Sequence, residues 1–242
     1  MSLIKISRDG HTDHAILSRP AAANVSSLER SREYLYADEA SGCYLGFSGS
    51  IAGECEFPSH PANELAIVVS GEMKISDRRG NLTVLREGDA AVVPRGVNCT
   101  IDQSRLGKRV FLLFRAPNQP DHSSPPGIVK VDPGATMEQC PFSLPAELLT
   151  SSPVPVSRKY VTYADEQTGF SVGLWACNPY SRHPITIGHH EFMQLLDGSC
   201  SLTGDDGVTA SLEKGDKLFI PRGSVFDWKS RVDVTKLFGS QD

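Results

Sequence analysis

The sequence has no long apolar run and no excess of basic charge. No segment approaches the ~18 consecutive apolar residues of a membrane span, and charged residues interrupt the first twenty, so no secretory signal is expected. Lys and Arg total 24 against 29 Asp and Glu, a net charge of -5, with no basic block that could follow a phosphate backbone. We therefore expect neither a membrane nor a nucleic acid as a partner.

Closely spaced cysteines and the common catalytic motifs are also missing. The six cysteines are widely spread, form no C-x-x-C pair, and belong to a chain of 242 residues that is long enough to fold without disulfides. Free thiols and a cytoplasmic location are the expectation. There is no G-x-S-x-G, G-x-G-x-x-G or H-E-x-x-H segment, so hydrolase triads, dinucleotide binding and zincin chemistry have no support.

What the sequence does contain is an internal repeat. The segment YADEASG from Tyr36 matches YADEQTG from Tyr163, at an offset of 127 positions. The same offset, without a gap, gives 15 identities between positions 36 and 101, and these include Glu64 with Glu191. So many ungapped identities indicate a duplication.

The duplication predicts two domains of ordinary size. We place an N-terminal domain at residues 1–115, a Pro- and Ser-rich linker at 116–127, and a C-terminal domain at 128–242. In both copies, short β-rich runs alternate with Gly, Pro and Asp turns, which favours an all-β sandwich or barrel. Only two short helices are expected, near residues 27–34 and 145–149.

Two spacings recur in both copies and resemble the signatures of the cupin superfamily. Gly88, five residues, then Pro94-Arg95-Gly96 matches one signature, and Gly215 with Pro221-Arg222-Gly223 repeats it. The runs Glu64–Gly71 and Glu191–Gly198 match the second half of the other signature. The chain is similar to the ethanolamine-utilisation-Q-like and ureidoglycine-aminohydrolase-like cupins, which implies two tandem RmlC-like jelly-roll barrels, a bicupin.

That resemblance implies a divalent metal, such as Zn, Mn, Fe or Ni, bound by three His and one Glu. In the first copy the corresponding positions hold Pro58, His60, Glu64 and Cys99. Imidazole, carboxylate and thiolate can together hold a borderline cation with an open coordination position. In the alternative interpretation, Glu64 bonds backbone or a neighbouring Arg, and Cys99 is a small buried apolar residue.

The second copy has lost three of the four implied ligands, because Ile185, Ile187 and Phe226 accompany Glu191 at these positions. A nonstandard site of His183, one of His189 or His190, and Glu191 is one interpretation, and exposed loop histidines are the other. Beside Glu191, the side chains that could line an apolar ligand pocket, or simply form the core, are those of Trp175, Met193, Phe226 and Trp228.

The sequence supports three hypotheses about function. The first is an enzyme that acts on a small polar metabolite with metal assistance in the N-terminal barrel. The second is a metal-free ligand-binding, regulatory or scaffold protein. The third is a role in assembly, with a homodimer as the simplest case. All catalytic residues and the substrate stay unassigned, because specificity depends on cavity side chains.

Overall fold

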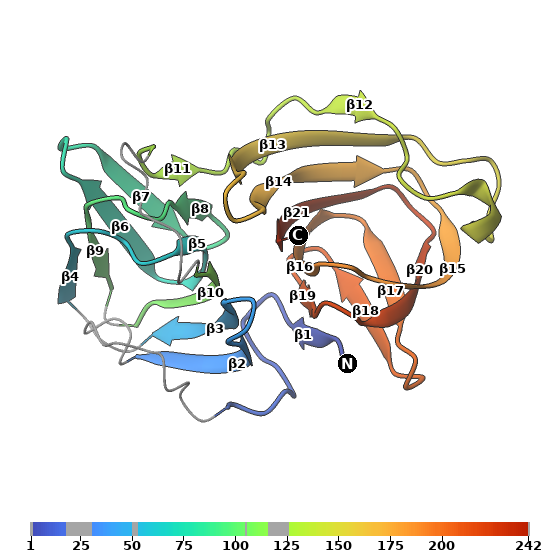
Figure 1. Ribbon diagram of the computed structural model, residues 1–242, viewed down its shortest axis with the longest axis horizontal. Coiled ribbons are helices and arrows are strands. Elements are labelled where there is room, and N and C mark those ends of the chain that lie inside the picture. Colours follow the sequence, from blue (N-terminus) through green and yellow to red (C-terminus); the bar gives the residue numbers. More distant parts are fainter. Residues whose placement is uncertain (1, 18–30, 50–52, 105, 116–125, 242) are drawn as a thin grey trace. The chain divides into compact units, whose positions relative to one another are not determined.

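The computed structural model describes residues 2–17, 31–49, 53–104, 106–115 and 126–241 (Figure 1). The chain divides into two compact units. We call His14–Val131 the N-terminal barrel, and Met1–Asp13 together with Asp132–Asp242 the C-terminal barrel. The expected linker, 116–127, lies outside the described residues except for Pro126 and Gly127.

The N-terminal barrel consists of two antiparallel sheets. The larger has the order β11-β8-β5-β10-β3-β2, and its strands are β11 (Val129–Lys130), β8 (Ala90–Val93), β5 (Asn63–Ser70), β10 (Lys108–Phe114), β3 (Cys43–Gly49) and β2 (Arg32–Asp38). The smaller has the order β4-β9-β6-β7, with β4 (Gly53–Phe57), β9 (Cys99–Gln103), β6 (Glu72–Asp77) and β7 (Leu82–Arg86). An apolar core lies between them, with members from both sheets.

The C-terminal barrel repeats this arrangement. Its larger sheet has the order β1-β19-β16-β21-β14-β13-β12, formed by β1 (Ile4–Ile6), β19 (Lys217–Ile220), β16 (His190–Asp197), β21 (Val234–Gln241), β14 (Phe170–Cys177), β13 (Ser157–Asp165) and β12 (Glu138–Cys140). The smaller has the order β15-β20-β17-β18, formed by β15 (Ser181–Thr186), β20 (Val225–Ser230), β17 (Ser199–Thr203) and β18 (Thr209–Glu213). The predicted duplicated all-β architecture is confirmed.

The two repeats exchange their first strands. β1, at the start of the chain, pairs with β19 of the C-terminal barrel, and β11, at the start of the second repeat, pairs with β8 of the N-terminal barrel. The unit boundaries therefore differ from the predicted ones: residues 1–13 belong to the C-terminal barrel, and 128–131 to the N-terminal one. Sequence similarity identified equivalent strands, but it does not show which copy each strand completes.

The recurring Gly-Asp turns anchor the exchanged strands. Asp89 accepts hydrogen bonds from the Arg86 backbone N–H at 2.9 Å and from Lys130 Nζ at 2.8 Å. In the other barrel, Asp216 accepts the Arg8 backbone N–H at 3.1 Å and lies 3.2 Å from Lys5 Nζ. These aspartates recur because each closes its turn and receives the lysine of the incoming strand.

Close backbone approach explains another repeated identity. A Cβ at Gly46 would lie 1.9 Å from the carbonyl oxygen of Glu33, and a Cβ at Gly173 would lie 2.1 Å from that of Tyr160. Each contact lies beside a β-bulge, where the pairing register shifts by one residue. The shift falls between Tyr34 and Tyr36 in the β2–β3 pair and between Val161 and Tyr163 in the β13–β14 pair. The bulge therefore requires glycine in both copies.

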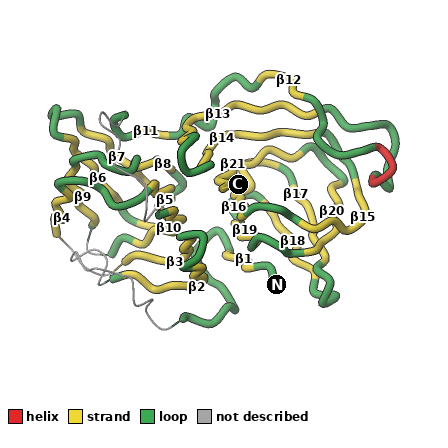
Figure 2. The backbone as a smooth tube through the Cα atoms, viewed as in Figure 1, coloured by secondary structure: helices red, strands yellow, loops and turns green. Residues whose placement is uncertain are grey.

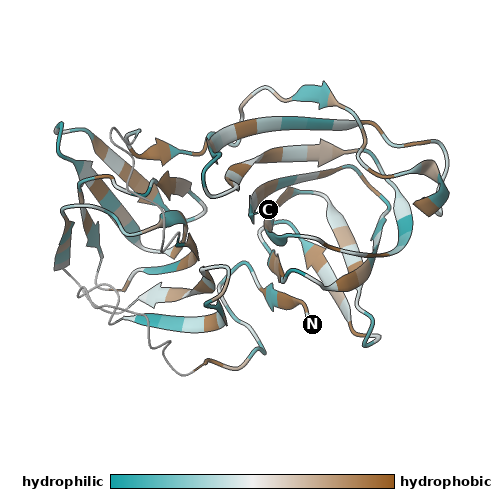
Figure 3. Cartoon of the chain, in the orientation of Figure 1, coloured by the Kyte–Doolittle hydropathy of each residue, from teal (hydrophilic) through white to brown (hydrophobic). Residues whose placement is uncertain are grey.

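Buried and less buried residues alternate along β9 and β20 of the smaller sheets, whereas β5, β8, β10 and β19 of the larger sheets are buried at nearly every position. Figure 3 shows brown and teal segments alternating along many strands. Helical structure is limited to one short 3-10 turn, Ala146–Leu148, in the part of the chain that the structure describes (Figure 2). The helix predicted at 27–34 is wrong over residues 32–34, because these residues form the beginning of strand β2. Residues 27–30 lie outside the described residues. None of the described helical structure is long and apolar enough to cross a membrane.

The strand exchange predicts crossed effects of two matched proline variants. Ile6 pairs with Lys217, and the Val131 N–H donates to the Ala90 carbonyl at 2.9 Å. Proline at either position cannot donate to the strand ladder and is tolerated poorly within a paired strand. We expect I6P to speed amide hydrogen exchange in β19 and V131P to speed it in β8, each leaving the other strand protected. Faster exchange of β8 in I6P would contradict the exchange of strands.

Candidate functional site

In the N-terminal barrel, Glu64 of β5 is completely buried between two arginines. Arg32 Nη2 of β2 donates to Glu64 Oε2, and Arg109 Nη2 of β10 lies 3.3 Å from Oε1. The Arg32 guanidinium also lies 4.6 Å from the centre of the Phe111 ring. Burial by itself would raise the pKa of Glu64, but the two guanidinium groups lower it well below its usual range. Glu64 is therefore a carboxylate whose charge is fully neutralised.

His60 lies beside this cluster, whereas Cys99 belongs to the apolar core. His60 Nε2 is 3.5 Å from Glu64 Oε2, and its Nδ1 is 2.7 Å from the Ala62 carbonyl oxygen. Burial, followed by the charge of Glu64, raises the pKa of the Cys99 thiol to about 12. Spacing thus correctly places His60 with Glu64, but Cys99 is a protonated thiol packed among apolar neighbours.

These residues do not fit a divalent metal. Among the described residues, no group of three or more His, Cys, Asp or Glu side chains could hold a metal ion, so His60, Glu64 and Cys99 do not form the predicted ligand set. The physical reason is that Arg32 and Arg109 already supply two positive charges to Glu64. A divalent cation would have to displace both arginines and deprotonate a buried thiol.

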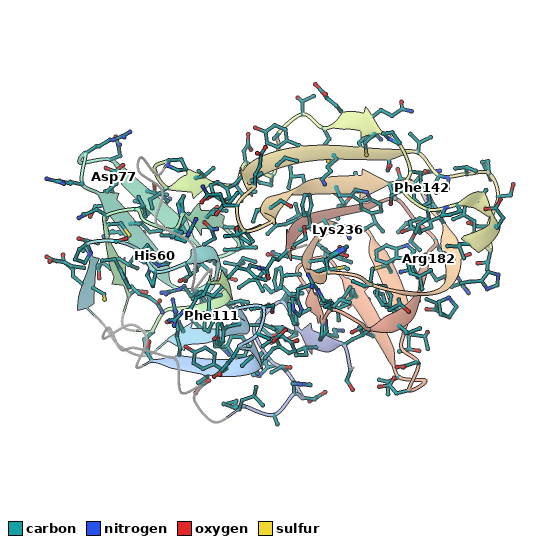
Figure 4. The ribbon with its side chains drawn as sticks, in the orientation of Figure 1. His60, Asp77, Phe111, Phe142, Arg182 and Lys236 are labelled. Atoms are coloured by element: carbon teal, nitrogen blue, oxygen red, sulfur yellow. The ribbon has the colours of Figure 1, made fainter. Side chains whose placement is uncertain are left out.

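The C-terminal barrel contains a cavity of about 450 Å³. Its walls come from both sheets and from the segment that follows β12. Figure 4 labels Phe142, Arg182 and Lys236 around it, from that segment, β15 and β21 respectively. Five of the six residues that the sequence offered for a ligand pocket here line it, namely Trp175, Glu191, Met193, Phe226 and Trp228. His183 does not: its side chain is exposed on β15.

One row of side chains crosses three strands of this cavity. Lys159 of β13 and Lys236 of β21 are both register partners of Trp175 on the central strand β14. Lys236 Nζ lies 4.9 Å from the Trp175 ring centre and 5.7 Å from that of Trp228. Side chains directly opposite each other on one sheet face make contact, so this row forms a continuous wall.

Lys236 also neutralises the retained glutamate. Its Nζ lies 2.6 Å from Glu191 Oε1, while His189 Nε2 lies 3.7 Å from Oε2. Burial by itself would raise the pKa of Glu191, but Lys236 and His189 lower it to about 2. The neighbouring His190 faces away from this group: it is buried, accepts the Arg222 N–H at 3.0 Å and stacks on Phe219.

The opposite wall is aromatic and carries one unused donor. Arg182 Nη1 donates to the Phe226 carbonyl at 2.6 Å, and its guanidinium lies 4.6 Å from the Phe226 ring centre. Tyr180 stacks on Trp228 with ring centres 5.6 Å apart, and Phe142 meets the edge of Tyr180 at 5.2 Å. Within the described residues, the buried Trp228 Nε1 has no hydrogen-bond partner. An indole N–H can only donate, so an acceptor in this cavity would satisfy it.

Sequence reasoning missed the cations Lys159, Arg182 and Lys236. Two of them could have been found by extending the offset of 127, which aligns Lys159 with Arg32 and Lys236 with Arg109. Even the aromatic contact is repeated, since Lys159 Nζ lies 4.7 Å from the ring centre of Phe238, the counterpart of Phe111. A search for identical residues misses these two positions, because each replaces an arginine by a lysine and keeps only the positive charge.

The fold and the two matched glutamate sites define a duplicated jelly-roll protein, and comparison with known proteins agrees. The model of the EutQ-like cupin domain matches residues 49–110 and 164–238. The chain belongs to this EutQ-like cupin family. No curated protein matches it.

Solved structures share the fold. A protein of unknown function from Pseudomonas syringae pv. tomato str. DC3000 is 22% identical over 99% of each chain, with a TM-score of 0.89. The Escherichia coli protein Ylba is 14% identical, with 99% of this chain and 90% of Ylba covered and a TM-score of 0.54. A salicylate 1,2-dioxygenase from Pseudaminobacter salicylatoxidans is 13% identical, with 83% and 71% covered and a TM-score of 0.51. At these identities the likeness shows the fold alone.

The lowered pKa of Glu191 predicts a specific acid sensitivity. The folded-state pKa of about 2 lies below the ordinary 4.5, so the stabilisation is present above about pH 4.5 and is lost as the pH falls towards 2. The shift corresponds to about 3 kcal/mol at neutral pH. We expect E191Q to unfold at a lower temperature than the wild type at pH 7, and this difference to vanish near pH 2.

Tryptophan fluorescence measures this effect selectively. The only two tryptophans of the chain, Trp175 and Trp228, both line the C-terminal cavity. E64Q is the matched control, because the equivalent change in the N-terminal barrel should leave the tryptophan-detected transition unchanged. A wild-type-to-E191Q difference that stayed constant from pH 7 to pH 2 would contradict the ion pair.

Proposed function

We propose that the C-terminal barrel binds a small organic anion, in particular an aromatic carboxylate, and that this binding needs no metal. The observation that carries the proposal is the charge of the cavity. Lys159, Arg182 and Lys236 line it, and among the described residues Glu191 is the single lining carboxylate. The protein as a whole has a net charge of -5, so a cavity with excess positive charge is a local specialisation.

The three cations differ in whether they are paired with a carboxylate of the protein. Lys236 is paired with Glu191. Lys159 lies over Phe238 and Arg182 donates to backbone carbonyls, and neither pairs with a carboxylate among the described residues. A ligand carboxylate would supply the missing negative charge, and guanidinium and ammonium donors bind such a group strongly when water is displaced.

The shape and lining favour a planar ligand. A volume of about 450 Å³ is within the range of small-molecule sites. Phe142, Tyr180 and Trp228 offer ring faces and edges for stacking, and the Trp228 N–H offers a donor. In the described part of the N-terminal barrel, the cavity beside Tyr34, Tyr44 and Arg115 measures about 10 Å³, which is room for about one water molecule.

Benzoate and indole-3-acetate are suitable probes, with benzamide as the neutral control. We expect both carboxylates to quench or shift tryptophan fluorescence and to raise the melting temperature in EDTA, and benzamide to have little effect. K159M should weaken carboxylate binding about 3- to 10-fold, the effect of one partly exposed ion pair. R158M is the matched control, because Arg158 precedes Lys159 on β13 and does not line the cavity.

Two results would contradict this proposal. One is binding of the carboxylates only after a divalent metal is added. The other is equal affinity for benzoate and benzamide, since the excess cationic charge would then play no part in recognition. Isothermal titration calorimetry at two salt concentrations adds a further check, because an anion bound by cations should bind more weakly at high salt.

A further inference from the structure

The ammonium group of Lys236 is enclosed on several sides. Two indole rings lie against it, those of Trp175 at 4.9 Å and Trp228 at 5.7 Å from Nζ to ring centre. The carboxylate of Glu191 is 2.6 Å away, and only 12% of the Lys236 side chain is exposed. Ring faces and a carboxylate are the groups that recognise organic ammonium ions, because both present negative potential to the cation.

The N-terminal barrel lacks this enclosure at the equivalent place. Arg109 occupies the position of Lys236, but Ser48 and Ile101 stand where the C-terminal barrel has Trp175 and Trp228. The Arg109 guanidinium instead donates to the side chain of Gln103. A cation beside the matched glutamate is thus common to both copies, whereas the aromatic enclosure is present in the C-terminal copy alone.

We propose that Lys236 is the specificity-determining residue of the cavity: its tethered ammonium permanently occupies an alkylammonium site formed by Trp175, Trp228 and Glu191. With the site filled from within, an organic cation finds no carboxylate or free indole face. The remaining basic groups then select an anion. The selection of an anion rests on the proposed function, whereas the existence of the ammonium site does not.

The test is to empty the site and offer a free ligand. K236A removes a propylammonium-sized group and leaves the Glu191 side chain, which is only 16% exposed, without its counter-ion. At pH 8, propylammonium chloride should bind K236A and raise its melting temperature by roughly 2–5 °C at saturating concentration. Propanol, which has the same shape without the charge, should give no such increase. Wild-type protein should respond to neither compound.

Two control variants separate the cage from general charge effects. K159A also loses a lysine, but that lysine lies over one ring, Phe238, and has no carboxylate partner in the described structure. Propylammonium should therefore not stabilise K159A. In the double variant E191Q/K236A the carboxylate is gone, and the response to propylammonium should disappear. If K236A does not fold, K236S, whose hydroxyl can hydrogen-bond Glu191, takes its place in the same titration.

A folded K236A or K236S variant that responds to propylammonium no more than the wild type would overturn the inference. So would an equal response in K159A. The proposed function fails differently, through absence of benzoate binding to the wild type, and each result is obtained without the other. If both hold, K236A should also lose preference for benzoate over propylammonium, which is the expected switch of specificity.

Discussion

A carboxylate on a central strand and the cation that neutralises it are the interaction on which both barrels are built. Glu64 is completely buried and the Glu191 side chain is 16% exposed, and both lie on equivalent strands where an unpaired charge would be costly. In each barrel the cation comes from the adjacent strand, Arg109 on β10 or Lys236 on β21, so the pair links two neighbouring strands through their side chains as well as their backbones. Because the protein's own cation already occupies the carboxylate, neither glutamate presents the uncompensated charge that a divalent metal needs.

The two copies differ in what surrounds that pair. In the N-terminal barrel two arginines contact Glu64, and Arg109 is tied further to Gln103, so wide planar groups and their hydrogen bonds complete the cluster. In the C-terminal barrel a lysine contacts Glu191 with a single ammonium, and the neighbouring wall is aromatic. A cavity of about 450 Å³ lies beside it. Duplication thus preserved the ion pair, while its surroundings became polar and planar in one copy and aromatic in the other.

The sequence predicted the fold well, because glycine and proline positions record backbone requirements directly. Gly46 and Gly173 are identical since a Cβ at either would collide with a carbonyl oxygen, and such identities revealed the repeat. Glu191 and Phe226, which line the cavity, were found because they align with the ligand positions of the family signatures, whereas Met193, Trp175 and Trp228 were offered as either pocket or core. His183 was not part of the cavity, and Arg182 beside it was missed, because alternation along a strand fixes opposite faces but not which face is inner.

The metal prediction for His60, Glu64 and Cys99 depended on which other side chains contact Glu64. Those side chains, Arg32 and Arg109, are far from Glu64 in the sequence, so spacing alone does not show that they neutralise it.

The exchange of first strands gives a physical reason for the two repeats to remain in one chain. Strand β16, which carries Glu191, pairs on one side with β21 and on the other with β19, and β19 is in turn completed by β1 from the beginning of the chain. Lys5 and the Arg8 backbone hold Asp216 at the turn before β19. The sheet that positions the Glu191–Lys236 pair therefore includes a strand separated from it by more than a hundred residues of the N-terminal barrel. A C-terminal repeat expressed alone would leave the edge of β19 unpaired, so the cavity depends on the N-terminal repeat even though no described residue of the N-terminal barrel lines it.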